Sequence, residues 1–196
     1  LVDPIAARAV LDAVGPDVVI NLAAATNVDE CERDPAAAFL QNAKAVSNIA
    51  QWIRSRGPAC HLVQVSTDQL YSGAGPHQES AVLPVNYYAY SKYVGELEAA
   101  AAPATVLRTN LFGRSGLPNR PSFSDWIVGA LREGRPLTVF EDVLFSPLSL
   151  ATLSRLIALV VERRPVGTFN LGSRSGMSKA DFAFSLARCL GLPTSG

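Results

Sequence analysis

The chain alternates short apolar runs with longer amphipathic stretches as far as about residue 110. The runs at 17–22, 60–66 and 104–109 are apolar on both faces, which is typical of strands buried in a parallel sheet. Stretches with helical periodicity separate these runs. The alternation predicts an α/β fold with a parallel, right-handed, doubly wound sheet. We expect its helices at 4–14, 35–56 and 84–101.

After Asn110 the pattern changes to shorter elements between loops that contain glycine and proline. Following a complete βαβ array, this change predicts a smaller second lobe, with residues 1–112 and 113–196 forming interleaved domains. A cleft between such lobes is the usual place for a small-molecule site. In the second lobe we expect helices at 123–132, 149–161 and 178–190, short strands at 137–140 and 168–172, and a turn at 142–147.

The composition narrows the class of protein. Apolar residues make up 48% of the chain and charged residues 17%, as in an ordinary globular domain. A net charge of zero gives no electrostatic reason to expect binding to nucleic acid or to an anionic membrane. Cys31, Cys60 and Cys189 form no Cys-x-x-Cys motif, which favours reduced thiols in a cytoplasmic protein. Because His61 and His77 lack metal-ligand spacing, we predict no metal site.

Candidate chemistry lies at Tyr88 and Lys92, four residues apart in sequence that favours a helix. Side chains at this spacing share one helix face. A neighbouring cation lowers the pKa of a tyrosine from its usual value near 10, which makes Tyr88 a candidate proton donor or acceptor. An amphipathic helix with a surface lysine is the alternative interpretation of this pair alone. Tyr87 and Tyr90 have no lysine four residues later and serve as controls.

Hydroxyl and carboxyl side chains end the strand that precedes this helix, at Ser66, Thr67 and Asp68. Chemistry in parallel α/β sheets lies just past the carboxyl ends of the strands. We therefore expect Thr67 and Asp68 near Tyr88 and Lys92. Capping of the next turn is the alternative use of Thr67.

Small residues follow the strand at 17–22, where they would allow another molecule to approach the backbone closely. Tight packing of a helix on the sheet is an equally good interpretation of this stretch. The residues are Ala23, Ala24, Ala25 and Thr26.

Taken together, these residues resemble the extended short-chain dehydrogenase/reductase family, and within it most closely the sugar-nucleotide reductases of the dTDP-4-dehydrorhamnose reductase branch. The matching blocks follow one another in order across residues 1 to about 115, and a weaker match follows at 140–147. The blocks are 16–24, 26–32, 42–43, 65–68, 88–96 and 107–109.

The resemblance implies a Rossmann-like, N-terminally incomplete sheet with a smaller α/β substrate lobe. Residues 1–112 would then be a partial dinucleotide-binding domain and 113–196 a partial substrate-binding lobe. The implied reaction is the NAD(P)-dependent reduction of a 4-keto nucleotide-diphosphate sugar with NADPH or NADH, in a cytoplasmic enzyme. A nucleotide sugar is the implied partner, and a homodimer is compatible with the family.

The same resemblance implies roles for individual residues. Tyr88 would protonate the C4 oxygen of the sugar, and Lys92 would bind the nicotinamide ribose and depress the pKa of Tyr88. Thr67 would hydrogen-bond the C4 oxygen. Further contacts with the substrate are expected from Asp68 and Leu111, and with the cofactor from Ala23, Ala24, Ala25, Thr26, Asn42, Val65, Tyr88 and Lys92.

The sequence departs from the family pattern in three places. Gln69, Leu70 and Tyr71 stand where the reductases commonly have Tyr-Val-Phe, and Leu111 stands where they often have a tryptophan. A glycine-rich turn that opens a helix after the first strand is absent, since Gly73-Ala74-Gly75 lies in a loop. We therefore expect an N-terminal βαβ segment to be missing and NAD(P)H to bind this chain weakly or not at all.

The same residues are compatible with two alternative functions. One is a nucleotide-sugar epimerase or dehydratase on the same scaffold, although a dehydratase usually has an acidic pair after the catalytic threonine and here Gln69 follows Asp68. Another is a non-catalytic regulatory or binding homologue, as with the regulatory subunit of methionine adenosyltransferase.

Overall fold

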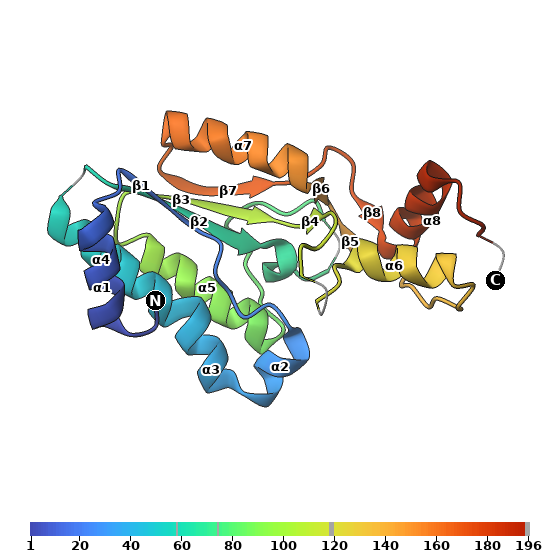
Figure 1. Cartoon of the computed structure of the whole chain (residues 1–196), viewed down its shortest axis with the longest axis horizontal. Coiled ribbons are helices and arrows are strands. Elements are labelled where there is room, and N and C mark those ends of the chain that lie inside the picture. Colours follow the sequence, from blue (N-terminus) through green and yellow to red (C-terminus); the bar gives the residue numbers. More distant parts are fainter. Residues whose placement is uncertain (58, 74, 118–119, 195–196) are drawn as a thin grey trace. The chain divides into compact units, whose positions relative to one another are not determined.

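The computed structural model describes residues 1–57, 59–73, 75–117 and 120–194 (Figure 1). Ala74, part of the glycine-containing loop considered above, lies outside the described residues. The chain divides into two compact units: unit 1 contains Leu1–Thr109 and Ile157–Leu171, and unit 2 contains Asn110–Leu156 and Gly172–Gly196. Among the described residues, none of the helices has both the length and the apolar composition needed to cross a membrane.

Unit 1 is built on a parallel sheet, as the apolar runs predicted. Its strands are β1 (Val18–Asn21), β2 (His61–Thr67), β3 (Ala104–Thr109) and β7 (Gly167–Leu171), in the order β1-β2-β3-β7. All neighbouring pairs are parallel. The carboxyl ends of the strands therefore lie at one edge of the sheet, which is where chemistry is expected.

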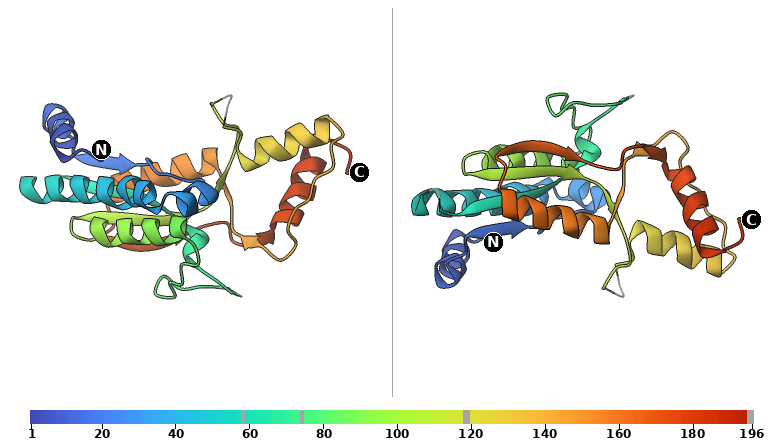
Figure 2. Two further views of the ribbon diagram at one scale, coloured as in Figure 1. Left: turned by 90° about the horizontal axis from the view of Figure 1, so that it is seen from below. Right: turned by 90° about the horizontal axis from the view of Figure 1, so that it is seen from above.

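Helices cover both faces of this sheet. Figures 1 and 2 show α1, α4 and α5 on one face and α7 on the other, with α4 and α5 side by side. The unit 1 helices are α1 (Pro4–Val14), α2 (Val28–Arg33), α3 (Pro35–Phe39), the π-helical turn η1 (Leu40–Lys44), α4 (Ala45–Arg56), the 3₁₀ turn η2 (Asp68–Leu70) and α5 (Tyr87–Ala99), together with the second half of α7 (Leu150–Arg163).

The core of unit 1 lies between the sheet and α4. Leu62 and Val106 point to this face and pack with Val46, Ile49 and Ile53 of α4. Each of these side chains is almost completely buried, so the apolar stripe of α4 fixes the helix against β2 and β3.

Unit 2 has a separate aromatic core. Ile127, Phe145, Phe182 and Ala183 form its buried cluster. Helices α6 and α8 of this unit each begin with a capping box, at Ser122 with Asp125 and at Ser178 with Asp181. The elements are α6 (Phe123–Arg132), α8 (Lys179–Leu190), the parallel pair β4 (Leu111–Phe112) and β6 (Leu148–Ser149), and the antiparallel pair β5 (Leu144–Phe145) and β8 (Met177–Ser178).

Two local predictions in the second half of the chain were wrong. No strand forms at 137–140, where Leu137 and Val139 instead pack their side chains on the aromatic core of unit 2. The segment predicted as a turn at 142–147 contains β5. The strand predicted at 168–172 is confirmed as β7, and its partner is β3 in the sheet of unit 1. A short apolar run becomes a strand only where a neighbouring strand is available, and this information is not local.

A buried histidine at the amino ends of β2 and β3 gives a prediction about stability. His61 is 4% exposed, and its Nε2 lies 2.8 Å from the Thr105 hydroxyl oxygen. That hydroxyl donates its hydrogen to the carbonyl of Pro165, so Nε2 must be the donor toward Thr105. Burial, and then the charge of Arg164, lower the pKa of His61 below its usual 6.5.

We therefore expect the contribution of His61 to the free energy of unfolding to fall as the pH drops below about 6.5 and to level off below the lowered pKa of folded His61. The reason is that the unfolded chain binds a proton which folded His61 resists. Urea unfolding at several pH values, repeated for His61→Gln and for the control His77→Gln, measures this effect. The slope should disappear only in His61→Gln, and an equal slope in that variant would contradict the prediction.

Candidate active site

The carboxyl end of β2 places Thr67 at the centre of the candidate site. Thr67 is the last residue of β2 and is 4% exposed. Its hydroxyl oxygen accepts a hydrogen bond from the backbone N–H of Gln69 at 3.2 Å, so it does cap the next turn. The same hydroxyl lies close enough to the phenol of Tyr88 to lower the pKa of that phenol. Capping and contact with Tyr88 therefore coexist at Thr67, although the sequence presented them as alternatives.

Helix α5 carries both Tyr88 and Lys92 on its buried face, where they are 8% and 4% exposed. The helix begins at Tyr87 and not at Pro84, because the side chain of Asn86 caps it by accepting a hydrogen bond from the N–H of Ala89 at 2.7 Å. The interpretation of Lys92 as a surface lysine is therefore wrong.

Lys92 ties α5 to β2. Its ammonium Nζ donates to the backbone carbonyl of Val65 at 2.7 Å, two residues before Thr67. A cation held at this point lies where the carboxyl end of β2 meets the first turns of α5. The structure thus places Lys92 at the backbone of Val65, two residues before Thr67, a contact that the spacing of the two motifs did not predict.

Asn42 connects the small-residue loop after β1 to the same helix. Its side-chain oxygen accepts from the N–H of Ala25 at 2.8 Å, and its Nδ2 donates to the carbonyl of Ala25 at 3.0 Å. The same Nδ2 donates to the hydroxyl of Ser91 at 2.9 Å, and that hydroxyl donates to the carbonyl of Tyr88 at 2.9 Å. One buried amide therefore fixes the loop and the helix that carries Tyr88.

Gly95 lets α5 approach the π-helical turn around Asn42. A Cβ added at Gly95 would lie 2.2 Å from the backbone carbonyl oxygen of Asn42. The sequence predicted one continuous helix over 35–56, and this turn is where the structure departs from regular α-helix. Ser91 and Gly95 were not predicted as site residues, although a glycine inside a strong helical pattern often has a packing reason.

The expected effect of Lys92 on the pKa of Tyr88 was wrong. Burial raises the pKa of Tyr88 above its usual value of 10, and the hydrogen bond from Thr67 opposes that rise. Burial also lowers the pKa of Lys92 to about 8, against a smaller opposing effect of Glu96. Low dielectric disfavours the charged form of both groups, and the ammonium of Lys92 is directed to Val65.

The other predicted site residues occupy the expected segments. Asp68 is half-buried in η2, directly after Thr67, while Ala23 and Ala24 follow β1. Thr26 is exposed in the same loop. Leu111 is 44% exposed on β4 of unit 2. The binding roles given to these residues stay predictions.

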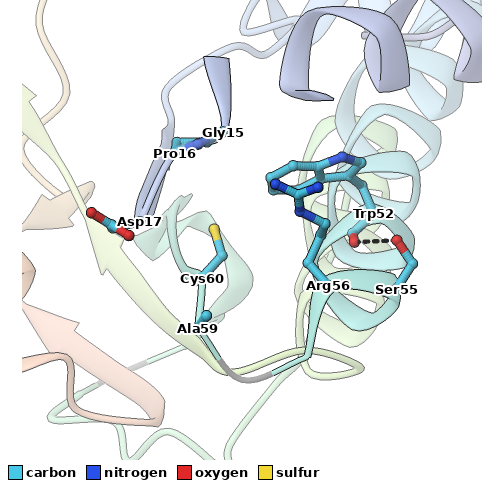
Figure 3. A pocket seen from close by; sticks show the side chains of 8 residues that line it. All are labelled: Gly15, Pro16, Asp17, Trp52, Ser55, Arg56, Ala59 and Cys60. Carbon is cyan, nitrogen blue, oxygen red and sulfur yellow. Dashed lines mark hydrogen bonds between the residues drawn. The ribbon is translucent and has the colours of Figure 1, made fainter. Parts of the chain in front are cut away.

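A pocket occupies the opposite edge of the sheet (Figure 3). Asp17 and Cys60, which directly precede β1 and β2, line it together with Trp52 and Arg56 of α4. The guanidinium of Arg56 stacks over the ring of Trp52, 5.4 Å from its centre. This pocket contains none of the predicted site residues, and it lies at the amino ends of parallel strands.

Comparison with known proteins identifies the family. A family model described as "RmlD substrate binding domain" matches residues 1–194. The chain belongs to this family. A probable dTDP-4,6-dihydroxy-2-methyloxan-3-one 4-ketoreductase of Streptomyces antibioticus is 40% identical over 195 residues, which cover 93% of the chain and 64% of that relative. The chain spans 62% to 67% of the length of other curated relatives.

Solved structures support the assignment to the RmlD family. A dTDP-4-dehydrorhamnose reductase of Clostridium acetobutylicum superimposes with a TM-score of 0.87 at 28% identity, covering 97% of this chain and 68% of that one. A dTDP-4-dehydrorhamnose reductase of Bacillus anthracis in complex with NADP gives 0.89 at 24% identity, covering 99% and 69%, and shows the shared fold. The resemblance to the sugar-nucleotide reductase branch and the Rossmann-like fold are thus confirmed.

Proposed function

We propose that the protein containing this chain catalyses the NAD(P)-dependent reduction of a 4-keto nucleotide-diphosphate sugar. The observation that carries the proposal is the placement of Thr67, Tyr88 and Lys92 where the carboxyl end of β2 meets the start of α5. The names of the RmlD relatives support the same reaction class. A homodimer and a cytoplasmic location belong to the same proposal.

Tyr88 is suited to act as the acid in a reduction. Its raised pKa keeps the phenol protonated at neutral pH, which is the form that can donate to an oxygen gaining negative charge. The hydroxyl of Thr67 favours the deprotonated form of this phenol and would stabilise the phenolate left after proton transfer. Lys92, one turn along the same helix face, supplies a positive charge below about pH 8.

The residues after β1 fit a dinucleotide. Ala23, Ala24 and Ala25 carry small side chains at the carboxyl end of a parallel strand, and Asn42 holds the backbone of Ala25 through two hydrogen bonds. A rigid backbone without bulky side chains permits the close approach that such a cofactor needs. When bound, NADPH or NADH would supply the hydride. Val65 and Lys92 would lie on the cofactor side of the same edge.

The substrate class follows from the relatives named above and from the polar groups beyond β2. The hydroxyl of Thr67 would hydrogen-bond the C4 oxygen that Tyr88 protonates, and Asp68 follows at once in η2 to contact the sugar. A dTDP-linked 4-keto-6-deoxyhexose is therefore the first substrate to test.

The direct test is an assay of the full-length protein with dTDP-4-keto-6-deoxyglucose and NADPH or NADH. We expect oxidation of the cofactor, measured by the loss of absorbance at about 340 nm, to be coupled to formation of the 4-hydroxy sugar. Analysis of the product would identify an epimerase or dehydratase by interconversion of the sugar without net oxidation of the cofactor. Failure to convert any 4-keto nucleotide sugar, while the protein still binds one, would favour a binding or regulatory role.

A further inference from the structure

Arg108 is a buried cation outside the residues named so far. It lies on β3, between Ser66 of β2 and Asn170 of β7 in the register of the sheet, and its side chain is 4% exposed. Its Nε and Nη2 contact the carboxylate of Glu96, with the shortest distance 2.6 Å from Nη2 to Oε2. A bidentate pair of this kind fixes both partners in one geometry.

Glu96 lies one helical turn after Lys92 on α5, so the two side chains share a face. Oppositely charged residues at this spacing normally attract each other. In the described part of the chain, however, the carboxylate of Glu96 is bound by Arg108, whereas the ammonium of Lys92 donates to Val65 at 2.7 Å. Arg108 thus forms the ion pair with the Glu96 carboxylate that Lys92 would otherwise form.

We infer that Arg108 is a positioning residue of the proposed active site: it holds the Glu96 carboxylate and so leaves Lys92 bound to Val65 and directed to the site. The inference rests on the proposed function for its catalytic consequence. The contacts themselves are independent of any substrate. Without Arg108, a buried carboxylate would lose its partner, which is costly, and Lys92 is the nearest cation on its own helix face.

A second group of contacts connects Arg108 to the segment after η2. We call residues 71–73 and 75–83 the strap. Nη1 of Arg108 donates to the hydroxyl of Tyr71 at 2.8 Å and to the carbonyl of Glu79 at 2.6 Å. Asn170 of β7 also binds the strap, because its side-chain oxygen accepts from Tyr71 and its N–H donates to the carboxylate of Glu79.

The strap offers a different explanation for any effect of losing Arg108, and the test must separate the two. Tyr71→Phe removes the hydrogen bonds of the Tyr71 hydroxyl with Arg108 and Asn170 and leaves the pair of Arg108 with Glu96 intact. Several other charged or titratable groups surround Lys92, Tyr88 and Arg108 and can affect the titration of Lys92. They are Tyr88 and Glu96 on α5, Asp68 in η2, Cys31 on α2, and Tyr71 and Glu79 in the strap.

The test follows the titration of Lys92 by NMR of lysine-labelled full-length protein, with its signal assigned by its loss in Lys92→Met. Arg108→Met should raise the pKa of Lys92 by about 1, because the freed carboxylate then pairs with the ammonium. The double variant Arg108→Met/Glu96→Gln should return it to the wild-type value of about 8. Glu96→Gln alone should lower it, and Tyr71→Phe should leave it unchanged.

An unchanged pKa of Lys92 in folded Arg108→Met, or a double variant displaced as far as the single one, would overturn the inference. An equal shift in Tyr71→Phe would assign the effect to the strap and overturn it as well. If Arg108→Met does not fold, Glu96→Gln decides, and the absence of a fall there overturns the inference. The titration needs no turnover, so failure of the proposed reaction is seen separately, as a wild-type protein without activity.

Discussion

Tyr88→Phe is expected to lower turnover of the full-length protein by at least about 100-fold, the usual contribution of a general acid. Only the phenol oxygen is removed, while the buried ring keeps its packing against Cys31 and Ala38. Fold and cofactor binding should therefore remain. Steady-state rates with a 4-keto nucleotide sugar and NADPH, together with a cofactor titration, measure the two effects separately.

The matched control is Tyr90→Phe on the same helix. Tyr90 is 53% exposed, and its ring makes an edge contact with Tyr87. Its removal should leave turnover within a few-fold of the wild type. A loss at Tyr90 as large as that at Tyr88 would show that the wrong phenol was chosen, and unchanged turnover in Tyr88→Phe would rule out proton donation by Tyr88.

Gly95→Ala is expected to destabilise unit 1 by about 3 kcal/mol or more, the upper range for overpacking. The new methyl group would lie 2.2 Å from the carbonyl oxygen of Asn42, a backbone atom that cannot move aside by changing a rotamer. Either α5 or the π-helical turn must shift, and with it the hydrogen bonds that Asn42 donates to Ala25 and Ser91. Turnover should fall together with stability.

Gly129→Ala provides the opposite result in another helix. Gly129 lies inside α6, and nothing is within 4 Å of a Cβ added there. Alanine should therefore stabilise unit 2 by about 0.5 to 1 kcal/mol. Trp52 lies in unit 1 and Trp126 in unit 2. Urea unfolding followed by tryptophan fluorescence therefore measures unit 1 in a Trp126→Phe background and unit 2 in a Trp52→Phe background.

Unchanged stability of unit 1 in Gly95→Ala would contradict the close approach of α5 to Asn42.

Much of the candidate site could be predicted from sequence because its parts are local motifs. The strand ending in Thr67 and the helix carrying Tyr88 and Lys92 are each defined by a few neighbouring residues, and the parallel topology brings their ends together. The prediction that Lys92 lowers the pKa of Tyr88 was wrong. Spacing alone placed a cation near a phenol, but the pKa values depend on burial and on the competing partner Val65, which only the packed structure supplies.

The sequence alone determined the elements whose signals are local: strands at apolar runs, and helices begun by the caps Asp3 and Ser178. Tertiary structure decided which short apolar runs pair with another strand and where α5 contacts the π-helical turn. It also decided which cation forms an ion pair with Glu96. The physical reason is the separation along the chain over which each interaction acts. Capping and periodicity act within a few residues, whereas pairing, close approach and burial of charge join segments far apart along the chain.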